Sequence, residues 1–322
     1  MDVLLVHDIT RTSMNGIIRH CYNISDVFCN DKEVNIVFLP NDIVKQTSSL
    51  FGKAFYKFSS LNRFLKTSSC HVVHIHGFAS LVIPELIILS KIHKKKIVYT
   101  AHYHPFKYLR SPQIAKCFFY LFIRPFLGLI DIITTINKED TAFFRKYHSS
   151  VCMMPNWIDA SLIPSSCTNK KRNMLLFIGR VDTNKGIEHL YSIPKGKYDI
   201  HCVLNKYIYH EGWTVHTNIN EQKLRDLYEQ AALVIIPSKY EAFSYVALEA
   251  LLHRTPIVIS DRVRIADYVS DCAGVTVFEY GDMRAFNQAI DKQVNGEVDN
   301  ERIQKIFDIN SIKEKLKNIY IK

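Results

Sequence analysis

The sequence has no run of about 18 uninterrupted apolar residues, the length that a membrane-spanning helix requires. It also lacks the basic start of a secretory signal peptide, because the chain begins MDVLLVHDIT and carries an acid at its second position. Residues 2–8 are better explained as a first buried strand. We therefore expect a cytoplasmic protein.

Recognisable patterns for disulfides and metals are missing as well. The eight cysteines are scattered without a CxxC pair, which is typical of free, buried thiols in a reducing compartment. Two histidine pairs, His74 with His76 and His102 with His104, have no third ligand at a suitable spacing. We expect no bound metal and no other cofactor.

Positive charge exceeds negative charge, giving a formal net charge of +10. Such a chain attracts anions, so nucleic acid, an anionic membrane surface and phosphorylated substrates are all candidate partners. No common nucleic-acid motif occurs, and the basic residues are spread along the chain rather than gathered in one tract. The charge therefore favours a membrane surface or a sugar nucleotide over nucleic acid.

Short apolar runs rich in valine and isoleucine alternate with helix-like stretches, as parallel sheets covered on both faces require. The pattern pauses in a polar stretch near 155–172 and then restarts, which predicts an α/β protein of two Rossmann-like, doubly wound domains. We place the domains at 1–158 and 159–305, with a final helix over 306–322 that packs back on the first domain. The predicted strands are 2–8, 34–40, 71–77, 95–102, 131–137, 174–180, 198–204, 233–238, 256–260 and 275–278.

The stretch from 235 to 260 reads as strand, loop, helix and strand, with Glu241 opening the helix and Glu249 eight residues later. This order places a helix N-terminus at the carboxyl edge of a sheet, where open α/β sheets bind ligands and where phosphate is favoured. Glu249 would lie roughly 12 Å further along the helix axis, so one carboxylate could meet a sugar and the other a ribose. A surface helix packed through its apolar face would show the same pattern.

A second candidate site begins at the strand that ends in Gly179 and continues through Arg180, Lys185 and Gly186. Glycine allows a ligand to approach the backbone, and the two cations can neutralise a diphosphate. A solvated basic turn would look similar. This loop lies in the same half of the chain as Glu241, however, and it supplies the cations that a phosphate site at the Glu241 helix would need.

Taken together, these motifs resemble glycosyltransferase family 4, a group of retaining enzymes that use nucleotide-sugar donors and have the GT-B fold. The resemblance implies two Rossmann-like domains that face a central cleft. The matching elements are GR and KG within 179–186, Glu241 and Glu249, TPIVIS at 255–260 and PNWID at 155–159, with weaker matches at 74–77 and 100–102.

The resemblance also implies roles for individual residues. Arg180 and Lys185 would bind the donor diphosphate, Glu241 the sugar hydroxyls and Glu249 the ribose, while His102 would face the reacting sugar. The implied catalytic residues are His102, Arg180, Lys185 and Glu241. The implied donor-binding residues are Asn15, Gly16, Gly179, Arg180, Lys185, Glu241, Ala242, Phe243, Ser244 and Glu249.

Departures from the family pattern leave alternatives open. Ala242 and Ser244 stand where glycines are common, and the stretch 205–219 lacks the usual glycine-rich loop that helps to hold the base. A catalytically silent nucleotide-sugar-binding module and a sugar-nucleotide epimerase therefore remain alternatives to a transferase.

We expect a retaining, metal-independent hexosyltransferase that uses a UDP-sugar and a glycan or lipid-linked saccharide acceptor in polysaccharide or glycoconjugate biosynthesis. Aromatic and basic residues alternate within 51–66, which indicates peripheral contact with the cytoplasmic membrane face. The more apolar stretch 106–130 is expected to form a pair of helices packed on the sheet.

Overall fold

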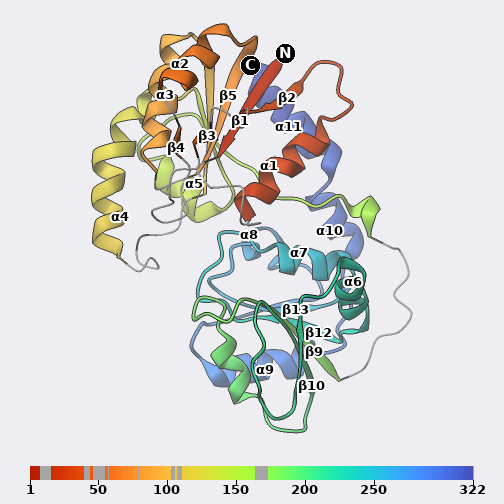
Figure 1. The fold of residues 1–322 in the computed structure, drawn as a ribbon. Helices are drawn as coiled ribbons and strands as arrows, with labels where there is room; N and C mark the ends of the chain where they lie inside the picture. The colour runs from red at the N-terminus through yellow and green to blue at the C-terminus, as the bar shows by residue number, and fades with distance from the viewer. Residues whose placement is uncertain are drawn as a thin grey trace. The chain divides into compact units, whose positions relative to one another are not determined.

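The computed structural model divides the chain into two compact units (Figure 1). The N-terminal unit comprises 1–156 and 309–322, and the C-terminal unit comprises 157–308. These borders lie close to the predicted boundaries. The structure describes residues 1–7, 16–39, 44–45, 55–56, 58–77, 80–102, 106, 111–163 and 173–321.

The N-terminal unit is built on a parallel sheet of six strands in the order β2-β1-β5-β6-β7-β8. The interiors of its central strands are almost wholly buried, which explains their apolar sequences. The strands are β1 (Asp2–His7), β2 (Asn35–Phe38), β5 (Cys70–Gly77), β6 (Lys96–Ala101), β7 (Ile132–Thr135) and β8 (Val151–Met153); a separate antiparallel pair comprises β3 (Val44–Lys45) and β4 (Phe55–Tyr56).

Helices cover both faces of this sheet (Figure 1). The last helix of the chain belongs to this unit, where Lys313 and Lys317 form ion pairs with Asp31 and Glu33 at 2.9 and 2.8 Å. The helical segments are α1 (Gly16–Val27), α2 (Phe58–Thr67), α3 (Val82–Ile92), α4 (Pro112–Phe118), the π-helix η3 (Phe119–Ile123), the 3-10 helix η4 (Arg124–Leu129), α5 (Lys138–Phe144) and α11 (Ile309–Ile321).

The C-terminal unit holds a second parallel sheet, in the order β11-β10-β9-β12-β13-β14. Counted along the chain this is the order 3-2-1-4-5-6, so the strand order reverses between β9 and β12. The strands are β9 (Met174–Gly179), β10 (Asp199–Leu204), β11 (Trp213–Thr217), β12 (Leu233–Ile236), β13 (Ile257–Ser260) and β14 (Val275–Phe278). The helices are the 3-10 segments η5 (Ala160–Leu162) and η6 (Ile187–Ser192), with α6 (Glu221–Gln230), α7 (Tyr245–Leu252), α8 (Ala266–Val269), α9 (Met283–Gln293) and α10 (Asn300–Ile306).

Within the two six-stranded sheets, two strands were not predicted from the sequence, and each lies at an edge of its sheet; the short pair β3 and β4 was not predicted either. β8 has only three residues, and β11 reads WTVHT and is half-buried, so neither gives a strong apolar signal. The predicted class of two doubly wound parallel-sheet domains is confirmed by the observed sheets.

The apolar stretch 106–130 differs in part from the expected packed pair of helices. Its described residues form one helical run, 112–129, through α4, η3 and η4. Phe119 and Ile123 are fully buried against the core, whereas Ile114 and Leu121 are 71% and 60% exposed. One face of the run therefore packs as predicted, and the other faces solvent. Within the described residues, no helix is both long and apolar enough to cross a membrane.

Candidate functional site

The loop after β9 is shaped by a short turn within the C-terminal unit. The Asp182 carboxylate accepts hydrogen bonds from the backbone N–H groups of Asn184 and Lys185, both at 3.0 Å. Gly186 follows in a left-handed conformation with φ of 68°, and an added Cβ would lie 1.9 Å from the Pro237 carbonyl oxygen. Only glycine fits at Gly186, because the loop passes directly over the chain that leaves β12.

This turn directs Lys185 back across the end of β9. A Cβ at Gly179 would lie 3.2 Å from Cγ of Lys185, so the absence of a side chain there leaves room for the lysine stem. The Lys185 Nζ donates a hydrogen bond to Oε1 of Glu241 at 2.9 Å, and the two side chains are only 20% and 13% exposed. The structure thus pairs two predicted site residues that are 56 positions apart in sequence.

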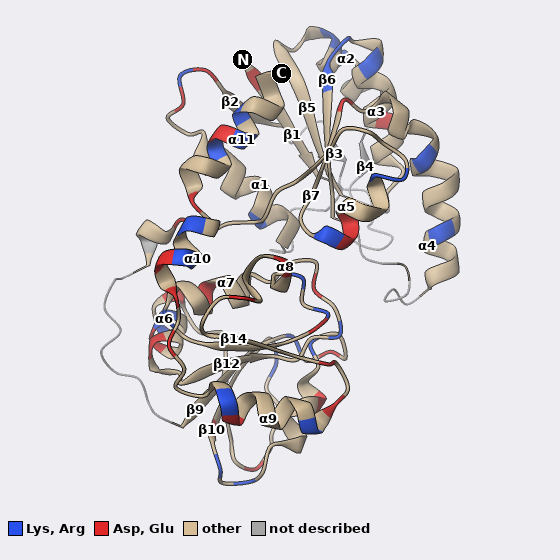
Figure 2. Cartoon of the chain, turned by 180° about the vertical axis from the view of Figure 1, so that it is seen from behind, with Lys and Arg blue, Asp and Glu red and all other residues tan. Residues whose placement is uncertain are grey.

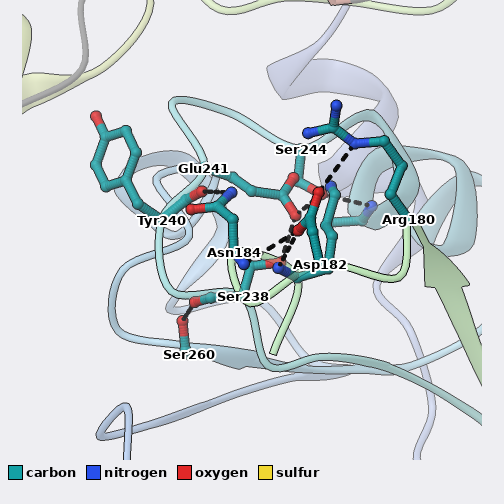
Figure 3. Close-up of polar contacts among 10 residues, drawn as sticks. Arg180, Asp182, Asn184, Ser238, Tyr240, Glu241, Ser244 and Ser260 are labelled. Atoms are coloured by element: carbon teal, nitrogen blue, oxygen red, sulfur yellow. Dashed lines mark hydrogen bonds and ion pairs between the residues drawn. The ribbon is translucent and has the colours of Figure 1, made fainter. Parts of the chain in front are cut away.

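Hydroxyl groups complete the surroundings of Glu241. The Ser238 hydroxyl, just beyond β12, donates to Oε1 at 2.6 Å, and Ser244 lies on the other side of the glutamate (Figure 3). Burial raises the pKa of Glu241, but the Lys185 charge and hydrogen bonds from Ser238, Lys185 and Ser244 outweigh it and hold the pKa below its usual value. Glu241 is therefore a partly enclosed, ionised carboxylate at neutral pH.

Glu241 does not open the following helix, contrary to the prediction. Its N–H donates to the Arg262 carbonyl at 3.2 Å and its carbonyl accepts from the N–H of Arg264 at 2.9 Å, so its backbone groups are committed to the segment after β13. The helix α7 instead begins at Tyr245, with Ser244 as its N-cap. The first turn of α7 therefore follows Glu241 by four residues.

Glu249 lies on the second turn of α7 and is half-buried. Its Oε2 accepts a hydrogen bond from the hydroxyl of Tyr228 at 2.7 Å. Tyr228 belongs to α6, is 1% exposed and stacks on His253 with ring centroids 5.3 Å apart. A buried side chain of α6 thus holds the second predicted glutamate, Glu249, on α7.

The remaining predicted residues of this unit differ in what they offer a ligand. The Arg180 side chain is 68% exposed and points outward from the loop (Figure 3). Its Nε lies 3.2 Å from a carboxylate oxygen of Asp182. Phe243 is buried and its ring contacts Tyr268 and Phe307, so only its backbone could meet a ligand. Ala242 is half-buried.

Two predicted residues that the structure describes belong to the N-terminal unit. His102 directly follows β6 and is 8% exposed, while Gly16 is the first residue of α1. Asn15 lies outside the described residues. His102 is part of a group of histidines, of which the sequence had suggested only the pair His74 and His76 and, separately, His102.

Four imidazoles meet near the carboxyl ends of β5 and β6, and we refer to His20, His74, His76 and His102 as the histidine cluster. The Nδ1 of His76 lies 3.3 Å from Nε2 of His102, and the rings of His74 and His76 are 4.1 Å apart between centroids. Burial lowers the pKa of His20 to about 4 and places the pKa values of His74 and His76 well below the usual range. These rings are therefore neutral at physiological pH.

No three His, Cys, Asp or Glu side chains are placed to hold a metal ion in the part of the chain that the structure describes. The absence of a metal from the reaction remains a prediction.

Ser238, Asp182, Asn184 and Tyr228 also shape the site and were not identified from the sequence. Ser238 and Asp182 each follow a strand end closely, a position that could have singled them out. Tyr228 has no such signal, because its contact with Glu249 depends on how α6 packs.

The C-terminal unit thus places an amine, a carboxylate, a hydroxyl and the start of α7 at the point where the strand order reverses. This is the position where doubly wound sheets bind ligands. A cation and a helix N-terminus suit phosphate, and an ionised carboxylate accepts hydrogen bonds from hydroxyls.

Comparison with known proteins agrees with this chemistry. The model of the family described as glycosyl transferases group 1 matches residues 194–306. An uncharacterised 41.2 kDa protein in the cps region of Klebsiella pneumoniae is 23% identical over 269 residues, which cover 69% of this chain and 71% of that protein.

Solved structures resemble the chain over nearly its whole length. Sucrose-phosphate synthase from Thermosynechococcus elongatus superposes with a TM-score of 0.73 at 17% identity, covering 99% of this chain and 98% of the other. Anabaena HepE in complex with UDP-glucose gives a TM-score of 0.70 at 13% identity, covering 99% of each chain. The fold is GT-B, and the match of residues 194–306 to the glycosyl transferases group 1 model agrees with the predicted resemblance to a glycosyltransferase family.

Proposed function

We propose that this chain is a retaining glycosyltransferase that transfers a hexosyl group from a UDP-sugar to a glycan or lipid-linked saccharide, without a metal ion. Glycosyl transfer as the general activity is supported by the family match and by the GT-B fold. The donor, the acceptor, the stereochemistry and the metal independence are our proposal.

The single observation that carries the proposal is the Lys185–Glu241 pair at the end of β9 and β12. Lys185 would turn to a donor phosphate, and Glu241 would accept hydrogen bonds from the sugar hydroxyls. Because both side chains are largely shielded from water, their interactions with a bound donor would be stronger than those of exposed groups.

Breaking the bond between the sugar and the nucleotide develops positive charge on the sugar and negative charge on the departing diphosphate. Lys185, the backbone N–H groups at the start of α7, and Arg180 released from Asp182 would stabilise the negative charge. For retention, we propose that the acceptor attacks the face from which the diphosphate leaves and that the diphosphate takes up the acceptor's proton. Glu241 would then orient the sugar rather than form a covalent bond with it.

UDP is proposed as the nucleotide because HepE, a structural neighbour, was solved with UDP-glucose. The neighbour shows only that this fold accommodates such a donor elsewhere. Glu249, fixed by Tyr228, would bind the ribose hydroxyls.

A screen of mixed nucleotide sugars and lipid-phosphate-linked acceptors, read by mass spectrometry, tests the activity. Turnover by Lys185→Ala and by Glu241→Ala should each fall by roughly two to three decades, because each variant loses one charged group of the site. Lys195→Ala is the matched control, since Lys195 forms an exposed ion pair with Glu211 in the same unit. The assignment would be refuted if folded Lys185→Ala and Glu241→Ala proteins turned over the donor at the wild-type rate. If the wild type bound the donor without turnover, a catalytically silent module would be favoured.

We also propose peripheral membrane contact, through the exposed face of residues 112–129. Ile114, Leu121 and Phe122 are exposed there beside Lys116 and Arg124. The stretch 106–130 contains no acidic residue, and Figure 2 shows basic but no acidic positions on α4. Apolar groups flanked by cations suit an anionic bilayer surface.

The originally predicted segment, 51–66, offers less support among its described residues. In α2, Leu61 and Leu65 are buried, leaving Phe58 as its exposed large apolar side chain; residues 51–54 and 57 lie outside the described part. Vesicle flotation with anionic lipid distinguishes the two surfaces. Leu121→Glu should abolish flotation and Phe58→Glu should leave it intact, whereas equal flotation of wild type and Leu121→Glu would refute contact through 112–129.

A further inference from the structure

Ser238 lies two residues after the end of β12 and is 1% exposed. Its hydroxyl donates a hydrogen bond to Oε1 of Glu241 at 2.6 Å, and the direction is fixed because a carboxylate can only accept (Figure 3). Hydrogen bonds from a hydroxyl to a carboxylate are among the shorter and stronger ones in proteins. Ser238 is therefore an uncharged donor that is held against the charged group of the site.

A second serine fixes the backbone of the first. Ser260 is the last residue of β13 and of the TPIVIS motif, and it is fully buried. Its hydroxyl donates to the carbonyl oxygen of Ser238 at 2.6 Å (Figure 3) and accepts from the N–H of Arg262 at 3.3 Å. The Arg262 carbonyl in turn accepts the N–H of Glu241 at 3.2 Å. The end of β13 thus holds both Ser238 and Glu241.

The loop after β9 also holds this segment, through Asn184. The Asn184 carbonyl accepts the N–H of Lys239 at 2.8 Å, and its side-chain amide donates to the Tyr240 carbonyl at 3.0 Å. Each residue of 238–241 is therefore bonded through its backbone either to the loop after β9 or to the end of β13. Because its backbone is held in this way, Ser238 offers its hydroxyl from a fixed place.

Lys185 and Ser238 share Oε1 of Glu241, but only Lys185 carries a charge. Under the proposed function, the Lys185 amine turns to the donor phosphate and leaves the carboxylate. A phosphate attracts the uncharged Ser238 hydroxyl far less. The hydroxyl therefore remains on Oε1, while the place that the amine vacates becomes available to a hydroxyl of the donor sugar.

We propose that Ser238 is a positioning residue that holds the Glu241 carboxylate in place for the donor sugar, and that Ser260 acts through Ser238. The inference rests on the proposed function for the contact between Glu241 and the sugar. The hydrogen bonds that join the two serines and the glutamate do not depend on it.

Calorimetric titration of UDP-glucose compares three variants. Ser238→Ala should raise the dissociation constant about tenfold, because a hydrogen bond to a charged group is lost. Ser260→Ala should raise it about threefold, because Ser238 keeps its hydroxyl and loses only the partner of its carbonyl. Ser192→Ala is the matched control and should bind as the wild type does, since the Ser192 hydroxyl donates to the His189 carbonyl at 2.7 Å in the same unit. Wild-type affinity in folded Ser238→Ala would overturn the positioning role.

A double-substitution cycle separates positioning from general damage to the loop. If Ser238 acts through the carboxylate, Ser238→Ala should have no further effect on the affinity for UDP-glucose in a Glu241→Ala protein. A merely structural role would weaken binding in both backgrounds. A further tenfold loss in the Glu241→Ala background would therefore contradict the proposal.

Carbon-13 NMR titration of the Glu241 carboxyl group tests the link without any donor. The signal is assigned by its loss in Glu241→Gln. Ser238→Ala should raise the pKa of Glu241, since one donor to the charged form is gone, and Ser192→Ala should not. An unchanged pKa in Ser238→Ala would overturn the inference. A raised pKa in a protein whose wild type does not bind UDP-glucose would support the link and refute only the proposed donor.

Discussion

Polar side chains are buried near the carboxyl ends of both parallel sheets, but their charge states differ. In the N-terminal unit, the histidine cluster is nearly or wholly buried and burial lowers the pKa values of His20, His74 and His76, so these rings stay neutral. In the C-terminal unit, Glu241 keeps its charge because Lys185 and two serine hydroxyls offset the cost of burial. The carboxyl edge of the N-terminal sheet therefore holds these neutral rings, whereas that of the C-terminal sheet holds an ionised carboxylate.

This difference indicates that the carboxyl edge of the C-terminal sheet is the one suited to an anionic ligand. A neutral imidazole offers one donor and one acceptor, which suits hydroxyl groups. The shielded amine of Lys185 and the start of α7 offer positive potential, which suits phosphate. Fold alone does not make this distinction, because both sheets are parallel and doubly wound.

The largest expected effect comes from breaking the turn that delivers Lys185. Gly186→Ala places a Cβ against the Pro237 carbonyl at a left-handed φ, and should lower the free energy of unfolding by at least about 3 kcal/mol. Urea unfolding of the C-terminal unit measures the loss. Gly196→Ala is the control, with φ of 73° and no atom within 4 Å of the added Cβ, and should cost about 1–2 kcal/mol. Equal costs for the two variants would show that the close approach at Gly186 is wrong.

The neutral rings of His20, His74 and His76 predict acid sensitivity of the N-terminal unit. The pKa of His20 is about 4 when folded, against 6.5 for an unperturbed histidine, so between these values the unfolded chain binds the proton more tightly. The contribution to stability is fully present above pH 6.5 and is lost as pH falls towards 4, by about 3 kcal/mol for His20 alone.

His20→Phe should flatten this pH dependence. Hydrogen exchange in β1 and β5, followed from pH 7.5 to 4.5, reports the stability of the N-terminal unit separately. An equally steep decline in wild type and His20→Phe would contradict the assignment of a neutral buried ring.

A smaller effect is expected where the last helix meets the histidine cluster. The hydroxyl of Tyr320 lies 2.8 Å from Nδ1 of His74 and both side chains are buried. Tyr320→Phe should cost about 1–2 kcal/mol, because it leaves a ring nitrogen without this partner. Tyr22→Phe, at a 48% exposed position, should change stability by less than about 0.5 kcal/mol. Thermal unfolding compares the two, and equal stability of both variants would refute the contribution of this bond.

The sequence predicts the strands that carry these edges because buried parallel strands are apolar on both faces. It misses β8 and β11, whose edge positions require no such pattern. It predicts Lys185, Glu241 and Glu249 as site residues from their motifs, but it places the start of α7 four residues too early. Pairing of the Glu241 backbone with Arg262 and Arg264 is a long-range effect that local helix signals do not contain.

The sequence also did not predict which residues far apart in the chain come into contact. His20 joins His76 and His102 only through the packing of α1 on the sheet, and Tyr228 meets Glu249 only through the packing of α6. Ser244 stood out in the sequence only as a serine where glycine is common. Its role as the N-cap of α7, with a φ of 131° and a hydroxyl that accepts a hydrogen bond from the Ala247 N–H, required the structure.

The central claim is that the shielded pair in the C-terminal unit forms the donor site. Calorimetric titration of UDP-glucose into the wild type, Lys185→Ala and Lys195→Ala tests it most directly. We predict that the dissociation constant rises about 10–100-fold in Lys185→Ala and is unchanged in Lys195→Ala, because only Lys185 would bind the diphosphate. Equal affinity of wild type and folded Lys185→Ala for UDP-glucose would contradict the claim.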